Sequence, residues 1–172
     1  VALEYRKRAV RNFKNSNEFE RLYVEWDTLT NANQGRITKR ELSRKVIELY
    51  PDKVDGYIMM GQSFSTNNEE SKEAISFFKK ALEIDPQNTA ATQNYIRYTY
   101  GGSMGSVRLR TDSDFYNQFD QEAKSLLEKF PKNLRIQSSI AALYRDSYNF
   151  SDESRIQKTL SIYSKCQEIV NE

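Results

Sequence analysis

The chain has 172 residues, with 26 Lys and Arg, 24 Asp and Glu, no His and one Cys, and a formal net charge of +2. Without His, the sequence excludes Ser-His-Asp and Cys-His catalytic pairs and His-bearing zinc sites. A single cysteine, Cys166, excludes an internal disulfide and a Cys-x-x-Cys motif. We therefore expect a binding protein and no enzyme, with neither a cofactor nor a metal ion.

The content of aromatic and hydrophobic residues indicates which type of hydrophobic core the chain can form. Aromatic residues make up 12% of the chain, which is too high for a disordered protein, and hydrophobic residues only 38%. A thin, layered core with a few large side chains per layer fits both values. No apolar run approaches the ~20 residues that span a bilayer, so we expect no membrane span. The start at Val1, without Met or a signal-like stretch, favours a processed or excised chain from which any targeting segment has been removed. Nothing else in the sequence indicates secretion, which favours an intracellular setting.

Apolar residues recur at helical spacing along the whole chain, and this pattern predicts about nine helices and no strand. In the last of them the predicted apolar stripe includes Leu160 and Tyr163, and Lys158 and Lys165 make its outer side polar, as in a capping helix. The predicted helices are centred on residues 1–15, 19–29, 42–49, 57–64, 74–82, 91–98, 115–127, 136–144 and 156–169.

All three prolines of the chain stand at the end of a predicted helix. Pro51, Pro86 and Pro131 each have Glu three residues before them, and they are 35 and 45 residues apart. Proline disfavours helical backbone in the residue before it, so each helix should end there. The spacing is that of a helical hairpin repeat.

Capping residues and turn residues mark further boundaries. Thr38 with Glu41 forms the pattern of a capping box, and Ser151 precedes the last predicted helix. Turns between paired helices are predicted at Gly35, at residues 67–68 and at Asn149.

Residues 54–87 resemble a tetratricopeptide repeat, a helix–turn–helix unit of about 34 residues. Large and small side chains alternate as in that family, at Tyr57, Met60, Gly61, Phe64, Ala74, Phe78, Ala81 and Pro86. Weaker resemblance extends over residues 17–53, 88–133 and 134–172, while residues 1–16 would add a helix in front. The resemblance implies a single domain that forms a right-handed, all-α solenoid.

Members of this family usually bind proteins or peptides in a concave groove lined by the first helix of each unit. The resemblance therefore implies an adaptor or scaffold. Asn94 and Arg97 are three residues apart on one predicted helix and could hold one carboxylate together, although a merely solvated face is the alternative. Ile58 and Gln62 stand where some members use Lys and Asn to grip a C-terminal carboxylate. The groove residues are Gln62, Gln93, Asn94, Arg97, Arg135 and Arg145.

The glycine-rich segment 101–112 predicts a long loop within the third unit. A phosphate-binding loop is disfavoured because no strand precedes the segment and Gly-Lys-Ser/Thr is absent. The alternatives are a mobile contact element and plain disorder. The expected contact residues here are Tyr98, Tyr100, Arg108 and Arg110.

Two basic runs offer a second function, RNA binding by a helical repeat. One run lies in residues 6–14 and the other, with Arg36, Lys39 and Arg40, in residues 36–45. Glu4, Glu41 and Glu48 dilute both, so nucleic acid is the less favoured partner. A homodimer through an exposed terminal helix is a further expectation.

Overall fold

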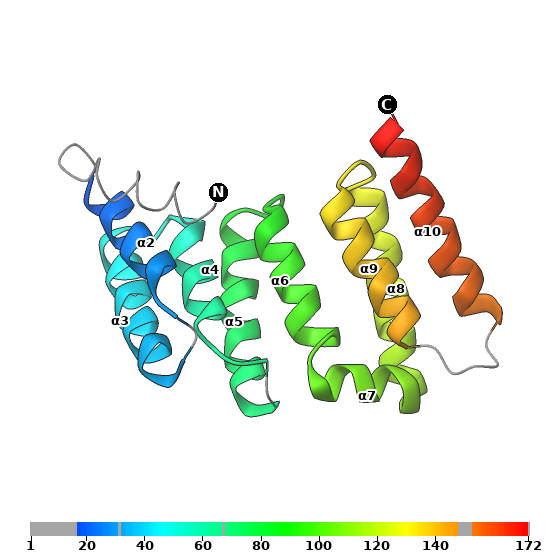
Figure 1. Ribbon diagram of the computed structural model, residues 1–172, viewed down its shortest axis with the longest axis horizontal. Helices are drawn as coiled ribbons and strands as arrows, with labels where there is room; N and C mark the ends of the chain where they lie inside the picture. The colour runs from blue at the N-terminus through cyan, green and yellow to red at the C-terminus, as the bar shows by residue number, and fades with distance from the viewer. Residues whose placement is uncertain (1–16, 31, 67, 148–152, 172) are drawn as a thin grey trace.

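The computed structural model describes residues 17–30, 32–66, 68–147 and 153–171, and in them it shows nine α-helices and no β-strand (Figure 1). The all-α fold is confirmed. The predicted helix at residues 1–15, the turn at Asn149 and the cap at Ser151 lie outside the described residues. The helices are α2 (Glu18–Thr28), α3 (Asn33–Leu49), α4 (Val54–Gln62), α5 (Asn68–Ile84), α6 (Thr89–Tyr100), α7 (Ser103–Thr111), α8 (Ser113–Lys129), α9 (Leu134–Asp146) and α10 (Glu153–Asn171).

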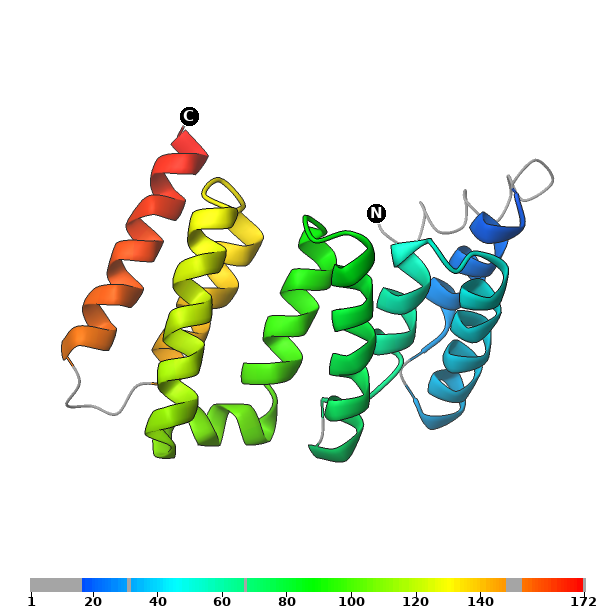
Figure 2. The ribbon, with the colours of Figure 1, turned by 180° about the vertical axis from the view of Figure 1, so that it is seen from behind.

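The helices stand side by side along the long axis of the molecule. Successive helices from α2 to α10 pack on one another, and α4 also contacts α6, which contacts α9. In Figure 1, α2 and α9 lie in front of α3 and α8, and the order is reversed in Figure 2. This arrangement is consistent with a helical repeat.

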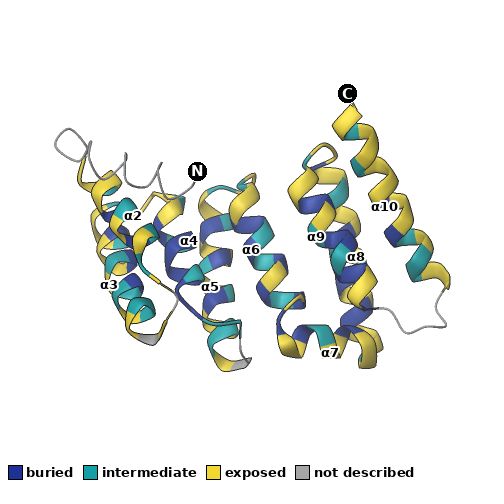
Figure 3. Cartoon of the chain, in the orientation of Figure 1, coloured by how far each residue is buried: buried dark blue, intermediate teal, exposed yellow. Residues whose placement is uncertain are grey.

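Small clusters of buried side chains follow one another along the row. Trp26, Val46 and Met59 form a cluster at one end, and Tyr100 with Phe119 belongs to the largest, near the other end. Buried residues in Figure 3 face the neighbouring helices, and exposed ones cover the outside. The described core is therefore thin and layered, as the composition predicts.

The prolines end the second helix of three hairpins, as predicted. α3, α5 and α8 end at Leu49, Ile84 and Lys129, each two residues before its proline. The asparagines two residues after Pro86 and Pro131 then start the next helices. Asn88 accepts a hydrogen bond from the Ala91 amide at 3.0 Å, and Asn133 from the Ile136 amide at 3.1 Å.

Gly61 lets α4 approach α5 closely. An alanine Cβ at this position would lie only 2.4 Å from Cε1 of Phe78, whose side chain is fully buried. Ala74 and Ala81 of α5 are also fully buried. The small residues at these positions pack as the sequence predicts.

The predicted capping box at Thr38 is wrong, because α3 begins five residues earlier. Thr38 lies within the helix and its hydroxyl donates to the carbonyl of Gln34. The predicted turn at Gly35 is also wrong, because this residue lies within α3. A Cβ at Gly35 would lie 2.2 Å from the Thr30 carbonyl oxygen, so only glycine lets α3 start so close to this carbonyl. The described capping box is formed by Asn17 and Glu20, at the start of α2.

The predicted loop at residues 101–112 is wrong, because most of it forms the helix α7. α7 packs on α6 and α8 and crosses the ends of these helices (Figure 1). A Cβ on Gly105 would lie 2.6 Å from the Tyr100 carbonyl oxygen. Glycine is therefore needed here for a close helix contact. Asp112 ends α7 and also accepts a hydrogen bond from the Phe115 amide, so it caps α8.

The predicted apolar stripe of α10 is also wrong. Thr159 and Ile162 are its buried residues, and α10 packs on α9. Leu160 and Tyr163 are exposed, at 56% and 36%, so the helix is not a polar cap. The reason is that α10 carries a second apolar stripe, about a quarter turn away from the first.

A polar network attaches α10 to α8 and α9. The carboxylate of Asp120 accepts hydrogen bonds from Lys158 of α10 at 2.5 Å and from Tyr144 of α9 at 2.8 Å. Lys124 pairs with the same carboxylate at 2.8 Å. Burial raises the pKa of Asp120, but the hydrogen bonds from Lys124, Lys158 and Tyr144 outweigh it and lower the pKa to about 2.

Candidate functional site

The predicted groove residues belong to α4, α6 and α9, three helices that contact one another in turn. Gln62 ends α4 and is half-buried. Gln93 of α6 donates from its amide to the hydroxyl of Ser139 in α9, at 3.2 Å. This contact joins the side chains of α6 and α9 at the middle of the two helices.

The prediction that Asn94 binds a ligand is wrong, because the side chain is buried. Its side chain is 8% exposed, and its amide donates to the carbonyl of Ala90 in the same helix at 2.8 Å. Ile58, expected on the same inner face, packs in the core with Ala81 and Ala91. Of the predicted α6 residues, Arg97 is exposed, and Gln93 is half-buried against α9.

Three arginines of α6 and α9 are exposed. Arg97 lies over the ring of Tyr98, with 5.4 Å from its guanidinium carbon to the ring centroid. Arg145 pairs with Asp146 at 2.9 Å, and this hydrogen bond raises its pKa. Arg135 has no ion pair or side-chain hydrogen bond among the described residues. We call Gln93, Arg97, Arg135 and Arg145 the α6–α9 face.

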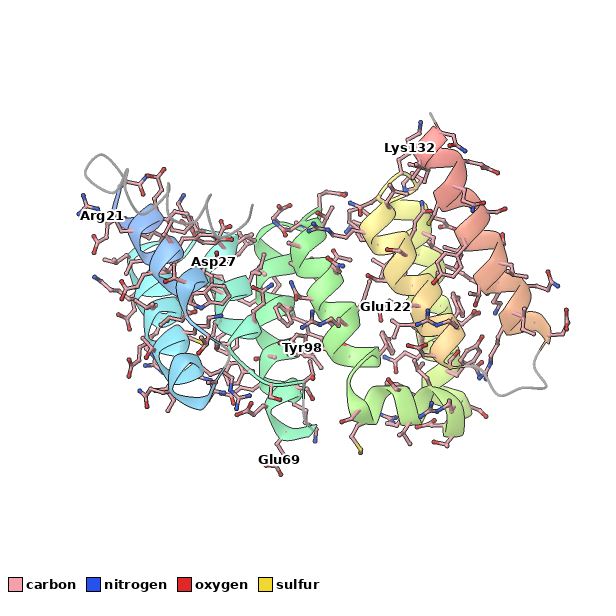
Figure 4. All side chains as sticks on the ribbon, viewed as in Figure 1. Arg21, Asp27, Glu69, Tyr98, Glu122 and Lys132 are labelled. Atoms are coloured by element: carbon pink, nitrogen blue, oxygen red, sulfur yellow. The ribbon has the colours of Figure 1, made fainter. Side chains whose placement is uncertain are left out.

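Two carboxylates lie near Tyr23, towards the other end of the row. Burial first, and then the nearby carboxylates of Asp27 in α2 and Asp55 in α4, raise the pKa of Tyr23. Figure 4 shows Asp27 on the side of α2 that faces α4. Asp27 and Asp55 therefore lie close to Tyr23, away from the three arginines of α6 and α9.

The prediction that Tyr98 and Tyr100 are exposed contact residues is wrong, because both side chains are buried. Tyr98 is 4% exposed and lies between α5 and α6 (Figure 4), where its hydroxyl donates to the Phe64 carbonyl at 3.0 Å. Tyr100 is 1% exposed and donates to Glu122 at 2.5 Å. Burial, followed by this bond to Glu122, moves the pKa of Tyr100 far above its usual range.

Replacing Tyr98 with phenylalanine should therefore affect folding and leave binding unchanged. Tyr98→Phe removes the hydrogen bond that the buried hydroxyl donates to the Phe64 carbonyl oxygen and should lower the free energy of unfolding by about 1 kcal/mol. Urea denaturation measures this change. A loss of ligand affinity at unchanged stability would contradict the structural role.

Arg108 and Arg110 are exposed on α7. Arg108 pairs with Asp112 at 2.8 Å and stacks on Phe115 at 3.9 Å, so much of its bonding capacity is used within the chain. The hydrogen bond from the Phe115 amide, followed by that from Arg108, lowers the pKa of Asp112. Arg110 has no such partner in the described part of the chain.

A cleft of about 510 Å³ lies between α5, α6 and α7. Ile75 and Phe115 supply apolar walls, and Lys72 and Arg108 supply positive charge. The sequence analysis missed this cleft because it predicted a loop where α7 forms one wall. Gly102 and Gly105 could have indicated the close packing of α7, but only if this segment had been predicted as a helix.

The second basic run is mostly occupied by internal contacts. Arg40 pairs with Glu70 at 3.0 Å, and Lys45 pairs with Glu18 at the same distance. Lys39 is 6% exposed and lies over the ring of Trp26, at 4.4 Å from its centroid. The first basic run, residues 6–14, lies outside the described residues.

Within the described ranges there is no group of three or more Asp, Glu, Cys or His side chains that could hold a metal ion. No helix in the same ranges has the length and apolar character needed to cross a membrane. No known protein-family model matches the sequence, and a search of curated proteins found no match.

Proposed function

We propose that this chain is a non-enzymatic adaptor that binds an acidic protein or peptide segment on the α6–α9 face. The carrying observation is the set of three exposed arginines on two adjacent helices, Arg97, Arg135 and Arg145, of which Arg135 has no ion pair within the described ranges. Guanidinium groups bind carboxylates with two parallel hydrogen bonds, which favours Asp, Glu or a chain terminus in the partner.

A tetratricopeptide-like, right-handed solenoid is part of this proposal. Support comes from the close contact of Gly61 with Phe78 and from helices that end just before each proline. In such a solenoid α4, α6 and α9 would line the concave side, where the exposed arginines belong. The carboxylates of Asp27 and Asp55 would then favour one orientation of a bound segment.

RNA binding remains the second candidate, with less support. Its basic run on α3 is engaged by Glu70, Glu18 and Trp26, which leaves Arg44 as an exposed cation of that helix. Salt separates the two functions: affinity for a single-stranded RNA should fall steeply with ionic strength, because phosphate contacts release counterions.

The first experiment selects peptides from a random displayed library on the immobilised chain. We expect the selected peptides to be enriched in Asp and Glu, since they must meet three guanidinium groups. Enrichment of Lys and Arg, or no enrichment at all, would contradict the proposal.

Arg97→Ala should then weaken binding of a selected acidic peptide about tenfold, or about 1.4 kcal/mol, because one guanidinium contact is lost. Calorimetric titration measures the change. Arg44→Ala on α3 is the matched control, since this arginine is also exposed but lies outside the α6–α9 face. Equal weakening by both variants would point to non-specific charge attraction.

A further inference from the structure

The last helix of the row presents apolar side chains to solvent. Leu160, Tyr163 and Val170 of α10 are 56%, 36% and 69% exposed, and Ile156 is half-buried in the same stripe. α10 stands at the end of the row in Figures 1 and 2, with α9 on one side. The spacing of four, three and seven residues is that of a helix–helix seam.

The same helix carries a hollow beside this stripe. Tyr163, Cys166, Gln167 and Val170 line it, together with Asn171. The first four are positions i, i+3, i+4 and i+7, which is the set that forms a hole for one side chain of a facing helix. Leu160, one turn before the hollow, is the most exposed apolar side chain in the first half of α10.

We propose that α10 is a homodimerisation surface, on which two copies of the chain pack their last helices antiparallel about a two-fold axis at Tyr163. In this register Leu160 of one copy enters the hollow of the other, and the second Leu160 enters the first hollow. An isologous contact needs such self-complementarity, and one helix here supplies both the projecting side chain and its hole.

The charges beside the stripe permit this pairing. The antiparallel register places Glu168 level with Lys158 of the second copy and next to Gln157, and it places Ser161 level with Lys165 and next to Ser164. No like charges meet along this flank. The net charge of +2 per chain adds little repulsion between two copies. A second copy therefore fits the stripe in shape and in charge.

Analytical ultracentrifugation of the whole chain tests the proposal. We expect a monomer–dimer equilibrium with a dissociation constant on the order of 10 μM, as for a small, single-helix interface. Leu160→Glu should weaken it at least tenfold, since a charge would have to enter the apolar hollow. The control is Val107→Glu on α7, a residue of similar exposure (46%) that should leave the equilibrium unchanged. A monomer at all concentrations up to about 200 μM, or equal effects of both variants, would overturn the proposal.

Single-cysteine variants test the register directly. In a Cys166→Ser background, Tyr163→Cys places two thiols across the two-fold axis, whereas Val170→Cys places them far apart. Mild oxidation should therefore crosslink the first variant at least tenfold faster than the second. Equal rates would indicate a parallel or non-specific contact. Peptide affinity per chain should be unchanged in Leu160→Glu, so this test is independent of the proposed function.

Discussion

Gly61→Ala is expected to lower the free energy of unfolding by about 2 kcal/mol, although alanine is normally the better helix residue. The new Cβ would lie 2.4 Å from the Phe78 ring, and that ring has no free space because it is fully buried. So close a contact with a buried ring puts the overpacking penalty at the upper end of its usual range, about 3 kcal/mol, against the ~1 kcal/mol gained from helix propensity. Gly61→Val should cost about twice as much, since two further methyl groups enter the same contact.

Gly56→Ala is the matched control in the same helix. Its Cβ would meet side-chain atoms of Val46 and Ile47 at 3.0 Å, a smaller overlap, and the change should be within about 1 kcal/mol of neutral. Urea denaturation of both variants measures the difference. Phe78→Leu should relieve part of the Gly61→Ala penalty in a double-mutant cycle. Additive effects would show that the two residues do not compete for space.

Asp120→Asn should lower the free energy of unfolding by about 2–3 kcal/mol at neutral pH. The substitution leaves Lys158 and Lys124 without their carboxylate and weakens the bond from Tyr144. The control is Asp146→Asn, which breaks an ion pair of 2.9 Å on an exposed surface. That variant should change stability by less than about 1 kcal/mol. Equal losses would show that the position of Asp120 between three helices is unimportant.

The same carboxylate should make stability depend on acid pH. The pKa of Asp120 falls from about 3.9 in the unfolded chain to about 2 in the fold, so the folded state binds its proton less readily. Its contribution of about 2 kcal/mol is fully present above pH ~4 and is lost as pH falls towards 2. Asp120→Asn should remove this part of the acid dependence. Unfolding curves at pH 6, 4 and 2.5 measure it, and an unchanged slope would contradict the assignment.

Local rules predicted most of the helices. Proline fixed three helix ends, and helical periodicity found the buried side of α4, α5 and α8. These features depend on a few neighbouring residues, and the structure confirms them. The prediction of a loop in the glycine-rich segment 101–112 was wrong because glycine is found both in loops and at close helix contacts. Gly102 and Gly105 look like loop residues in the sequence, but both are buried at contacts that leave no room for a Cβ.

The site was harder to predict because exposure depends on tertiary packing. Asn94 and Arg97 share a helix face within one turn, yet only Arg97 is exposed. Tyr98 and Tyr100 adjoin a predicted loop, and the neighbouring helices bury both. On α10 the two apolar stripes have similar spacing, and only the tertiary packing, which buries Thr159 and Ile162, shows which one faces the protein.

Asp112 couples the end of α7 to the start of α8. It is the last residue of one hydrogen-bonded segment and the first of the next, because its own amide donates to the Arg108 carbonyl while its side chain accepts from Phe115. Neither α7 nor α8 can fray at this junction without opening the other. Amides on both sides of Asp112 should therefore exchange with deuterium at one common rate, as a single cooperative unit of local unfolding.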